Sequence, residues 1–237
     1  MRASNHGELG LIVLSSCKEL GRLVDERILQ LRAEEDDDKS YLVPIEEVRF
    51  SNGEGKIKLL DSVRGKDIYI LCDVGNYSCE YTMFGRNHCM GPDEHFQDIK
   101  RVLSAIGGKA DRVTVIMPLL YASRQHKRKG RESLDCAMAL KELENLGVHA
   151  ILTFDVHDPT IHNAIPGTSF ENIFPTYSML KCFIANEGAN IKKDNMTVIS
   201  PDTGAMDRAI YYANTLGVDV GMFYKRRDHT VVVNGKN

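Results

Sequence analysis

Six short apolar segments, separated by polar and amphipathic stretches, limit most strongly what this chain can fold into. Each is five or six residues long and shows little polar alternation, as in strands that are buried on both faces of a sheet. The segments are residues 10–14, 68–72, 113–117, 149–154, 196–200 and 219–223. Because helix signals lie between them, they predict an α/β fold with a largely parallel sheet, flanking helices and right-handed crossover connections.

The helix signals are periodic apolar residues bounded by helix-ending residues. Apolar residues recur at helical spacing from Phe96 to Ile106, after Pro92 and before two glycines. A second helix is expected after Ser133 and before Gly147. Further helices are expected at about residues 17–32, 177–186 and 204–216.

Two segments depart from this alternation. Residues 48–60 have the pattern of a β-hairpin, because Asn52 and Gly53 form a turn signal between two apolar stretches. The segment 73–91 is rich in Gly, Tyr and Cys and has no periodicity, so we expect an irregular connection there.

Composition excludes several classes of protein. The 237 residues carry a net charge of −3, which argues against a general nucleic-acid binder. No apolar stretch approaches the ~20 residues that span a bilayer, and the N-terminus lacks the apolar region of a signal peptide. Six scattered Cys without a CxxC pair suit a reducing compartment. We therefore expect a cytoplasmic protein with no membrane partner.

Residues that directly follow the predicted strands carry the candidate chemistry, because ligands of parallel sheets bind at the carboxyl ends of the strands. After 113–117, five cations lie between Arg124 and Arg131, with no acidic residue among them. Such a loop attracts phosphate, although a solvated basic loop or an RNA-binding patch has the same composition. After 149–154, His157 is flanked by carboxylates and suits a divalent cation, while a structural histidine is an equal alternative.

The last two predicted strands are followed by similar candidates. Asp202 stands beside Gly204 at a strand-to-helix turn, which suits ribose hydroxyls or a metal, and equally suits a helix N-cap. Lys225, Arg226 and Arg227 could stabilise a transferring phosphoryl group or could be surface charge. We expect these four strand ends to belong to one sheet. Together they supply cations, an acid with His, an acid with Gly and cations, a mixture that suits a phosphorylated, metal-bound substrate.

In this order the motifs resemble those of the ribose-phosphate pyrophosphokinases. The matching stretches are RFSNGE at 49–54, VRGKDIYI at 63–70, 118–125, LTFDVH at 152–157, VISPDTG at 198–204 and KRR at 225–227. The resemblance implies tandem phosphoribosyltransferase-like domains: an N-terminal domain at 1–147 with an ATP hairpin, and the start of a second domain at 148–237. It also implies a Mg²⁺-dependent transfer of the β,γ-diphosphoryl group of ATP to the C1 hydroxyl of ribose 5-phosphate, with AMP released.

The resemblance further assigns roles to individual residues. Phe50, Asn52 and Glu54 would hold adenine on a hairpin that reaches the site of a neighbouring subunit in a homo-oligomer. The resemblance also implies that Arg124 and Gln125 would hold adenine and phosphates. His157 and Asp202 would bind Mg²⁺, and Asp202 would also lie near ribose 5-phosphate. Lys225 and Arg227 would lie on a mobile catalytic loop.

Two departures from the family pattern stand out. The family's loop for the 5-phosphate group would follow Arg227, and the sequence ends at Asn237, so we expect either a fragment of a longer enzyme or a homologue without that loop. His126 stands where the family usually has Asp, and the connection 73–91 is longer than usual. That region contains Cys72, Cys79, His88, Cys89 and His95. Their spacing fits no standard zinc pattern, so a zinc site is not favoured.

Three alternatives to an active pyrophosphokinase remain. The first is a non-catalytic regulatory homologue that binds nucleotide, which the missing loop favours and the retained Lys225 and Arg227 disfavour. The second is an RNA-binding module that uses residues 124–131, whose binding would weaken steeply with salt. A phosphoribosyltransferase is disfavoured, because it would need the same absent loop.

Overall fold

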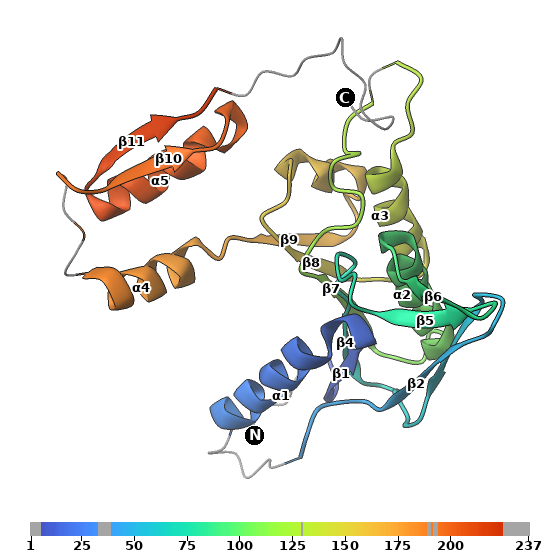
Figure 1. The fold of residues 1–237 in the computed structure, drawn as a ribbon. Coiled ribbons are helices and arrows are strands. Elements are labelled where there is room, and N and C mark those ends of the chain that lie inside the picture. The colour runs from blue at the N-terminus through green and yellow to red at the C-terminus, as the bar shows by residue number, and fades with distance from the viewer. Residues whose placement is uncertain (1–5, 33–38, 129, 189–190, 192–193, 225–237) are drawn as a thin grey trace. The chain divides into compact units, whose positions relative to one another are not determined.

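The computed structural model describes residues 6–32, 39–128, 130–188, 191 and 194–224 (Figure 1). The chain forms two compact units, Met1–Ile173 and Phe174–Asn237, which are described separately. The first unit extends past residue 147, where the sequence analysis placed the end of the N-terminal domain. The reason is that the strands β8 and β9, which follow residue 147, pair with the sheet of the first unit.

A five-stranded parallel sheet forms the centre of the first unit. Its strands, in spatial order, are β1 (Leu9–Val13), β4 (Asp67–Leu71), β7 (Arg112–Met117), β8 (Ala150–Phe154) and β9 (Ser169–Ile173). The central residues Ile12, Ile70 and Val115 are completely buried, as the apolar runs predicted. Since the strands are parallel, their carboxyl ends share one edge of the sheet.

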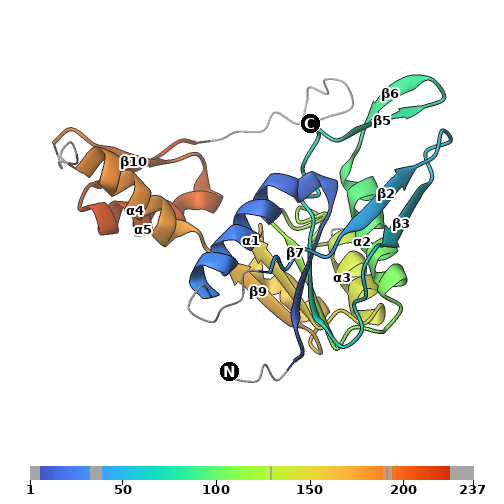
Figure 2. The same ribbon diagram turned by 90° about the horizontal axis from the view of Figure 1, so that it is seen from below.

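Helices cover both faces of this sheet (Figures 1 and 2). Alternate strand residues point to opposite faces, so Leu11 packs with α1 (Lys18–Arg32), whereas Ile12 belongs to the core under α2 (Pro92–Ile106) and α3 (Asp135–Asn145). Helix α2 begins after Gly91, whose N–H donates to Glu94 Oε2 at 2.9 Å, and it ends before Gly107, whose φ of +57° suits glycine. These helices confirm the prediction made from the spacing of the apolar residues.

Two antiparallel hairpins extend from the first unit, with their tips side by side (Figure 2). The hairpin of β2 (Ile45–Arg49) and β3 (Gly55–Leu59) confirms the predicted turn at Asn52 and Gly53. The hairpin of β5 (Glu80–Met83) and β6 (Arg86–Cys89) corrects the expectation of an irregular connection at 73–91. These strands are four residues long and mostly polar and exposed, so they leave no apolar period to detect.

The second unit contains α4 (Thr176–Glu187), β10 (Thr197–Ser200), α5 (Met206–Leu216) and β11 (Asp219–Met222). Strands β10 and β11 pair in parallel, and α5 packs on both. They form a two-stranded sheet of their own, so the expectation of one sheet for all the predicted strands was wrong. Short 3₁₀ segments lie at Ser15–Cys17, Pro159–Ala164 and Thr203–Ala205. Across the described residues, no helix combines the length and apolar character needed to cross a membrane.

The contact between α1 and β1 gives a test of this fold. A Cβ at Gly21 would lie 2.4 Å from Val13 Cγ1, so Gly21→Ala forces the helix away from the strand. We expect a loss of about 1–3 kcal/mol in the free energy of unfolding from this overpacking, measured by urea denaturation. Helix propensity alone predicts the opposite sign, a gain of about 1 kcal/mol.

The control for this experiment is Gln30→Ala, a substitution on the exposed side of the same helix. Its effect should stay within about 0.5 kcal/mol. A Gly21→Ala protein more stable than the parent would contradict the packing of α1 on β1.

Candidate functional site

The tip of the β2–β3 hairpin brings together three residues that the sequence analysis assigned to nucleotide binding. The side-chain Nδ2 of Asn52 donates to Glu54 Oε2 at 3.0 Å, and Asn52 Oδ1 accepts the Glu54 N–H at 3.1 Å. Gly53, with φ of +91°, allows the turn that places Gly53 N 2.9 Å from Phe50 O. Phe50 remains 47% exposed, so an aromatic surface stands beside fixed amide and carboxylate groups.

A buried ion pair holds this hairpin directly before its tip. Arg49 pairs with Asp98 of α2, and Asp98 also accepts a hydrogen bond from Arg101 Nη1 at 2.7 Å. Asp98 is only 5% exposed, so the two guanidinium groups compensate a charge that would otherwise be costly to bury. Sequence reasoning missed Asp98. The available signal was a carboxylate on the apolar face of the helix predicted around residues 96–106.

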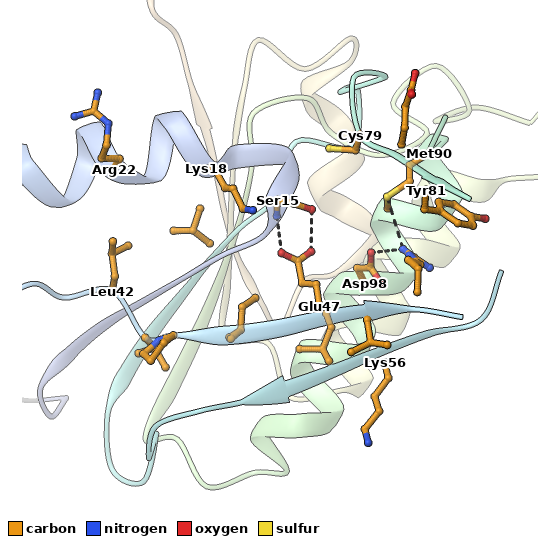
Figure 3. A pocket seen from close by; sticks show the side chains of 18 residues that line it. Ser15, Lys18, Arg22, Leu42, Glu47, Lys56, Cys79, Tyr81, Met90 and Asp98 are labelled. Atoms are coloured by element: carbon orange, nitrogen blue, oxygen red, sulfur yellow. Dashed lines mark hydrogen bonds and ion pairs between the residues drawn. The ribbon is translucent and has the colours of Figure 1, made fainter. Parts of the chain in front are cut away.

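An open cavity of about 700 Å³ lies at the foot of the two hairpins, between them and the start of α1. Figure 3 shows Glu47 reaching from the hairpin to Ser15, whose N–H and Oγ lie 2.9 and 3.0 Å from the two carboxylate oxygens. Burial raises the pKa of the Glu47 carboxyl, although the hydrogen bonds from Ser15 oppose this shift. Lys18 and Arg22 also line the cavity. Of the predicted site residues within the described ranges, none lines it.

The loops that follow β7 and β8 meet at the carboxyl edge of the sheet. Lys127 Nζ lies 2.6 Å and His126 Nε2 3.3 Å from Asp158 Oδ2, and the rings of His126 and His157 are 4.9 Å apart. Hydrogen bonds from Lys127 and Thr160 hold the pKa of the Asp158 carboxyl well below its usual range. The sequence analysis noted His126 only as a departure, and the structure shows that it links the two loops.

Three of the predicted residues are exposed at these loops. Arg124 and Gln125 begin the cationic loop after β7, and His157 follows β8. Each loop also contains a residue other than glycine with positive φ, namely Ala122 at +52° and Asp155 at +46°. Such backbone is uncommon and is concentrated at functional sites.

The residues implied for Mg²⁺ lie in separate units, His157 in the first and Asp202 in the second. Asp202 Oδ1 accepts the N–H groups of Gly204 at 3.0 Å and Ala205 at 3.2 Å, so it is an N-cap, as one of the two interpretations predicted. An imidazole nitrogen and a carboxylate oxygen are both ligands of divalent cations, and phosphate oxygens can complete the coordination of such a cation. Among the described residues there is no group of three or more His, Cys, Asp or Glu side chains arranged for a metal.

The remaining candidates have other surroundings. Cys72 is buried, with its Sγ 3.6 Å from Ser16 Oγ and 3.6 Å from His95 O, and His88 pairs with Glu94. Lys225 and Arg227, the implied catalytic-loop residues, lie outside the described residues.

Comparison with known proteins decides the family. Residues 9–147, more than half of the chain, match the model of the N-terminal domain of ribose phosphate pyrophosphokinase. The chain belongs to the ribose-phosphate pyrophosphokinase family. The hairpin tip and the loop with Arg124 and Gln125 lie inside this match, whereas His157 and Asp202 lie beyond it.

Individual relatives agree with this assignment. The ribose-phosphate pyrophosphokinase of Ralstonia nicotianae is 27% identical over 195 residues, which cover 80% of this chain and 54% of the relative. That of Helicobacter pylori is 25% identical over 182 residues, 76% of this chain and 51% of the relative. The chain therefore spans about half the length of these curated relatives. Phosphoribosylpyrophosphate synthetase from Mycobacterium smegmatis has the same fold, with a TM-score of 0.72 and 22% identity over 93% of this chain and 65% of that one.

The low pKa of Asp158 predicts how its contribution to stability depends on pH. A carboxyl whose pKa is lower in the folded state stabilises the fold above its unfolded pKa, and this contribution is lost as the pH falls. Asp158→Asn should therefore lower the melting temperature at pH 7, and the difference from the parent should shrink below about pH 4. Thermal denaturation between pH 7 and pH 3 measures this effect.

Asp61→Asn, which removes one exposed carboxylate, gives the baseline for a simple change in net charge. A difference between parent and Asp158→Asn that grew as the pH fell below about 4 would contradict the ion pair with Lys127.

Proposed function

We propose that the chain is the nucleotide-binding part of a ribose-phosphate diphosphokinase, which transfers the β,γ-diphosphoryl group of ATP to the C1 hydroxyl of ribose 5-phosphate. The observation that carries the proposal is the hairpin tip. There, an exposed Phe50 stands beside the interlocked Asn52 and Glu54, within the residues that match the family. An exposed aromatic ring offers stacking to a purine, and fixed amide and carboxylate groups offer hydrogen bonds to its edge.

The cationic loop after β7 provides the groups proposed to bind phosphate. Arg124 and Gln125 are exposed at the carboxyl edge of the sheet, where ligands of parallel sheets bind. Lys127 is neutralised by Asp158, whereas Arg124 begins the loop as an exposed guanidinium suited to phosphate oxygens. We assign Arg124 and Gln125 to the triphosphate and adenine of ATP.

In the proposed reaction the C1 oxygen of ribose 5-phosphate forms a bond to the β-phosphorus of ATP, and the C1 hydroxyl loses its proton. The bond between the β-phosphorus and the oxygen that bridges it to the α-phosphate breaks, so that AMP leaves. Such a transfer depends on charge neutralisation and in-line positioning. His157 and Asp202 would hold Mg²⁺, and Lys225 and Arg227 would neutralise the transferring group. Mg²⁺, when bound, supplies Lewis-acid neutralisation of the phosphate oxygens.

The direct test is ³¹P NMR of the chain with ATP, Mg²⁺ and ribose 5-phosphate. AMP together with a new C1-diphosphate signal supports the proposal. Mg·ATP binding without product supports a fragment of such an enzyme or the regulatory, nucleotide-binding alternative. RNA binding that falls steeply with salt, without Mg·ATP binding, supports the RNA-binding alternative.

Two variants should separate the base contact from the phosphate contact. Phe50→Ala should weaken Mg·ATP binding about three- to tenfold through lost stacking, while leaving the affinity for inorganic tripolyphosphate unchanged. Arg124→Ala should weaken both ligands, because the lost charge faces phosphate. Isothermal titration calorimetry with each ligand measures the difference.

Tyr77→Ala, which removes another exposed aromatic residue of the same unit, is the control and should bind both ligands like the parent. Unchanged Mg·ATP affinity in Phe50→Ala would remove the hairpin from the site.

We also propose that the hairpin acts across subunits of a homo-oligomer, as the family resemblance implies. If so, mixing Phe50→Ala and Arg124→Ala proteins after mild dissociation restores intact sites in mixed dimers, giving about a quarter of the parent activity on statistical grounds. If each hairpin serves its own subunit, no mixed dimer has an intact site. Activity of the mixture equal to the sum of the two variants would therefore contradict the exchange.

A further inference from the structure

The turn of the β5–β6 hairpin holds an aromatic residue where the backbone disfavours one. Phe84 has φ of +48° and Gly85 has φ of +77°, and they form the two-residue loop between the paired residues Met83 and Arg86. Turns of this kind strongly prefer Asn, Asp or Gly at the first position. A bulky side chain with positive φ is strained, and such strain persists only where the surroundings impose it.

The surroundings that impose it are the β2–β3 hairpin. Phe84 N donates to Ser51 O at 2.9 Å, and Ser51 directly follows Phe50. The side chains of Met83 and Tyr81 also pack against Gly53 in the other turn. A Cβ added at Gly53 would lie 2.9 Å from Met83 Sδ and 3.4 Å from Tyr81 Oη. Both views show the two tips side by side (Figures 1 and 2).

The foot of the β5–β6 hairpin is anchored as firmly as its tip. Tyr81 Oη donates to Glu94 Oε1 at 2.7 Å, and His88 Nε2 lies 3.1 Å from Glu94 Oε2. Arg49, which holds the other hairpin through Asp98, lies over the Tyr81 ring at 5.5 Å. The two hairpins therefore form one arm, residues 45–59 and 80–89, fixed to the start of α2.

The placement of Phe84 does not serve the core. The residue is 75% exposed, so its side chain gains little from burial, while its backbone is strained. Phe50, next to Ser51, is 47% exposed. The arm thus presents two exposed aromatic residues from adjacent turns, one of which the proposed function assigns to a purine base.

We propose that Phe84 is a second base-contacting residue, so that the arm holds the purine of a nucleoside triphosphate with Phe50 and Phe84 together. This inference rests on the proposed function and deepens it. The β5–β6 hairpin is then a specificity element that fixes the position of the Phe50 turn and adds an aromatic surface to it.

The test uses Phe84→Asn, because Asn tolerates positive φ. The melting temperature should stay the same or rise, while the dissociation constant for Mg·ATP rises about three- to tenfold through lost aromatic contact. The affinity for inorganic tripolyphosphate should not change. Phe84→Tyr, which keeps the ring, should bind Mg·ATP like the parent, and Tyr77→Asn is the control for loss of an exposed aromatic residue.

Each other outcome overturns the inference. If Phe84→Asn binds Mg·ATP like the parent while Phe50→Ala binds it weakly, Phe84 makes no base contact and the proposed function stands. A lower melting temperature with equal loss of both ligands shows a structural role only. A change confined to the oligomeric state in sedimentation shows a subunit contact. If the parent protein binds no Mg·ATP, both this inference and the proposed function fail.

Discussion

The arrangement of the candidate site depends on one buried carboxylate. Asp98 is 5% exposed and lies between the guanidinium groups of Arg49 and Arg101. A buried charge that loses a partner is far more costly than the pair itself, so the position of the hairpin is coupled to helix α2. Helix α2 in turn packs on the parallel sheet through residues such as Ile99 and Val102. The exposed Phe50 therefore stands on a rigid base, which is the requirement for a residue that must meet a ligand in one orientation.

A second constraint acts at the carboxyl edge of the sheet. Asp158 accepts hydrogen bonds from the loop after β7 and from its own turn, so the loops after β7 and β8 are held together before any ligand arrives. The ion pair neutralises Lys127 and leaves Arg124 and His157 exposed. A preorganised edge of this kind reduces the ordering that ligand binding would otherwise require.

The sequence predicted the elements that bury apolar surface and missed those that do not. The strands around Ile12, Ile70 and Val115 were predicted because their side chains are fully buried in continuous apolar runs. Strands β5, β6 and β9 were missed because they are short and mostly polar or exposed, so hydrogen bonding alone reveals them. The same distinction applies to the candidate site. Phe50, Asn52 and Glu54 form a local turn, which the sequence pattern reveals. The contacts of Glu47 with Ser15 and of Arg49 with Asp98 join residues that are distant in the chain, so no local pattern reveals them.

Backbone strain is present at three exposed or half-buried positions of the first unit. The three residues other than glycine that have positive φ within the described part of the chain are Phe84, Ala122 and Asp155. Ala122 and Asp155 lie in the loops that meet at Asp158, and Phe84 lies beside the Phe50 turn. Strained backbone costs stability and is retained where surrounding contacts over-determine it. All three positions lie beside groups that the proposed function assigns to the nucleotide or to Mg²⁺. The stability of the buried sheet allows these exposed loops to keep conformations that they would not adopt alone.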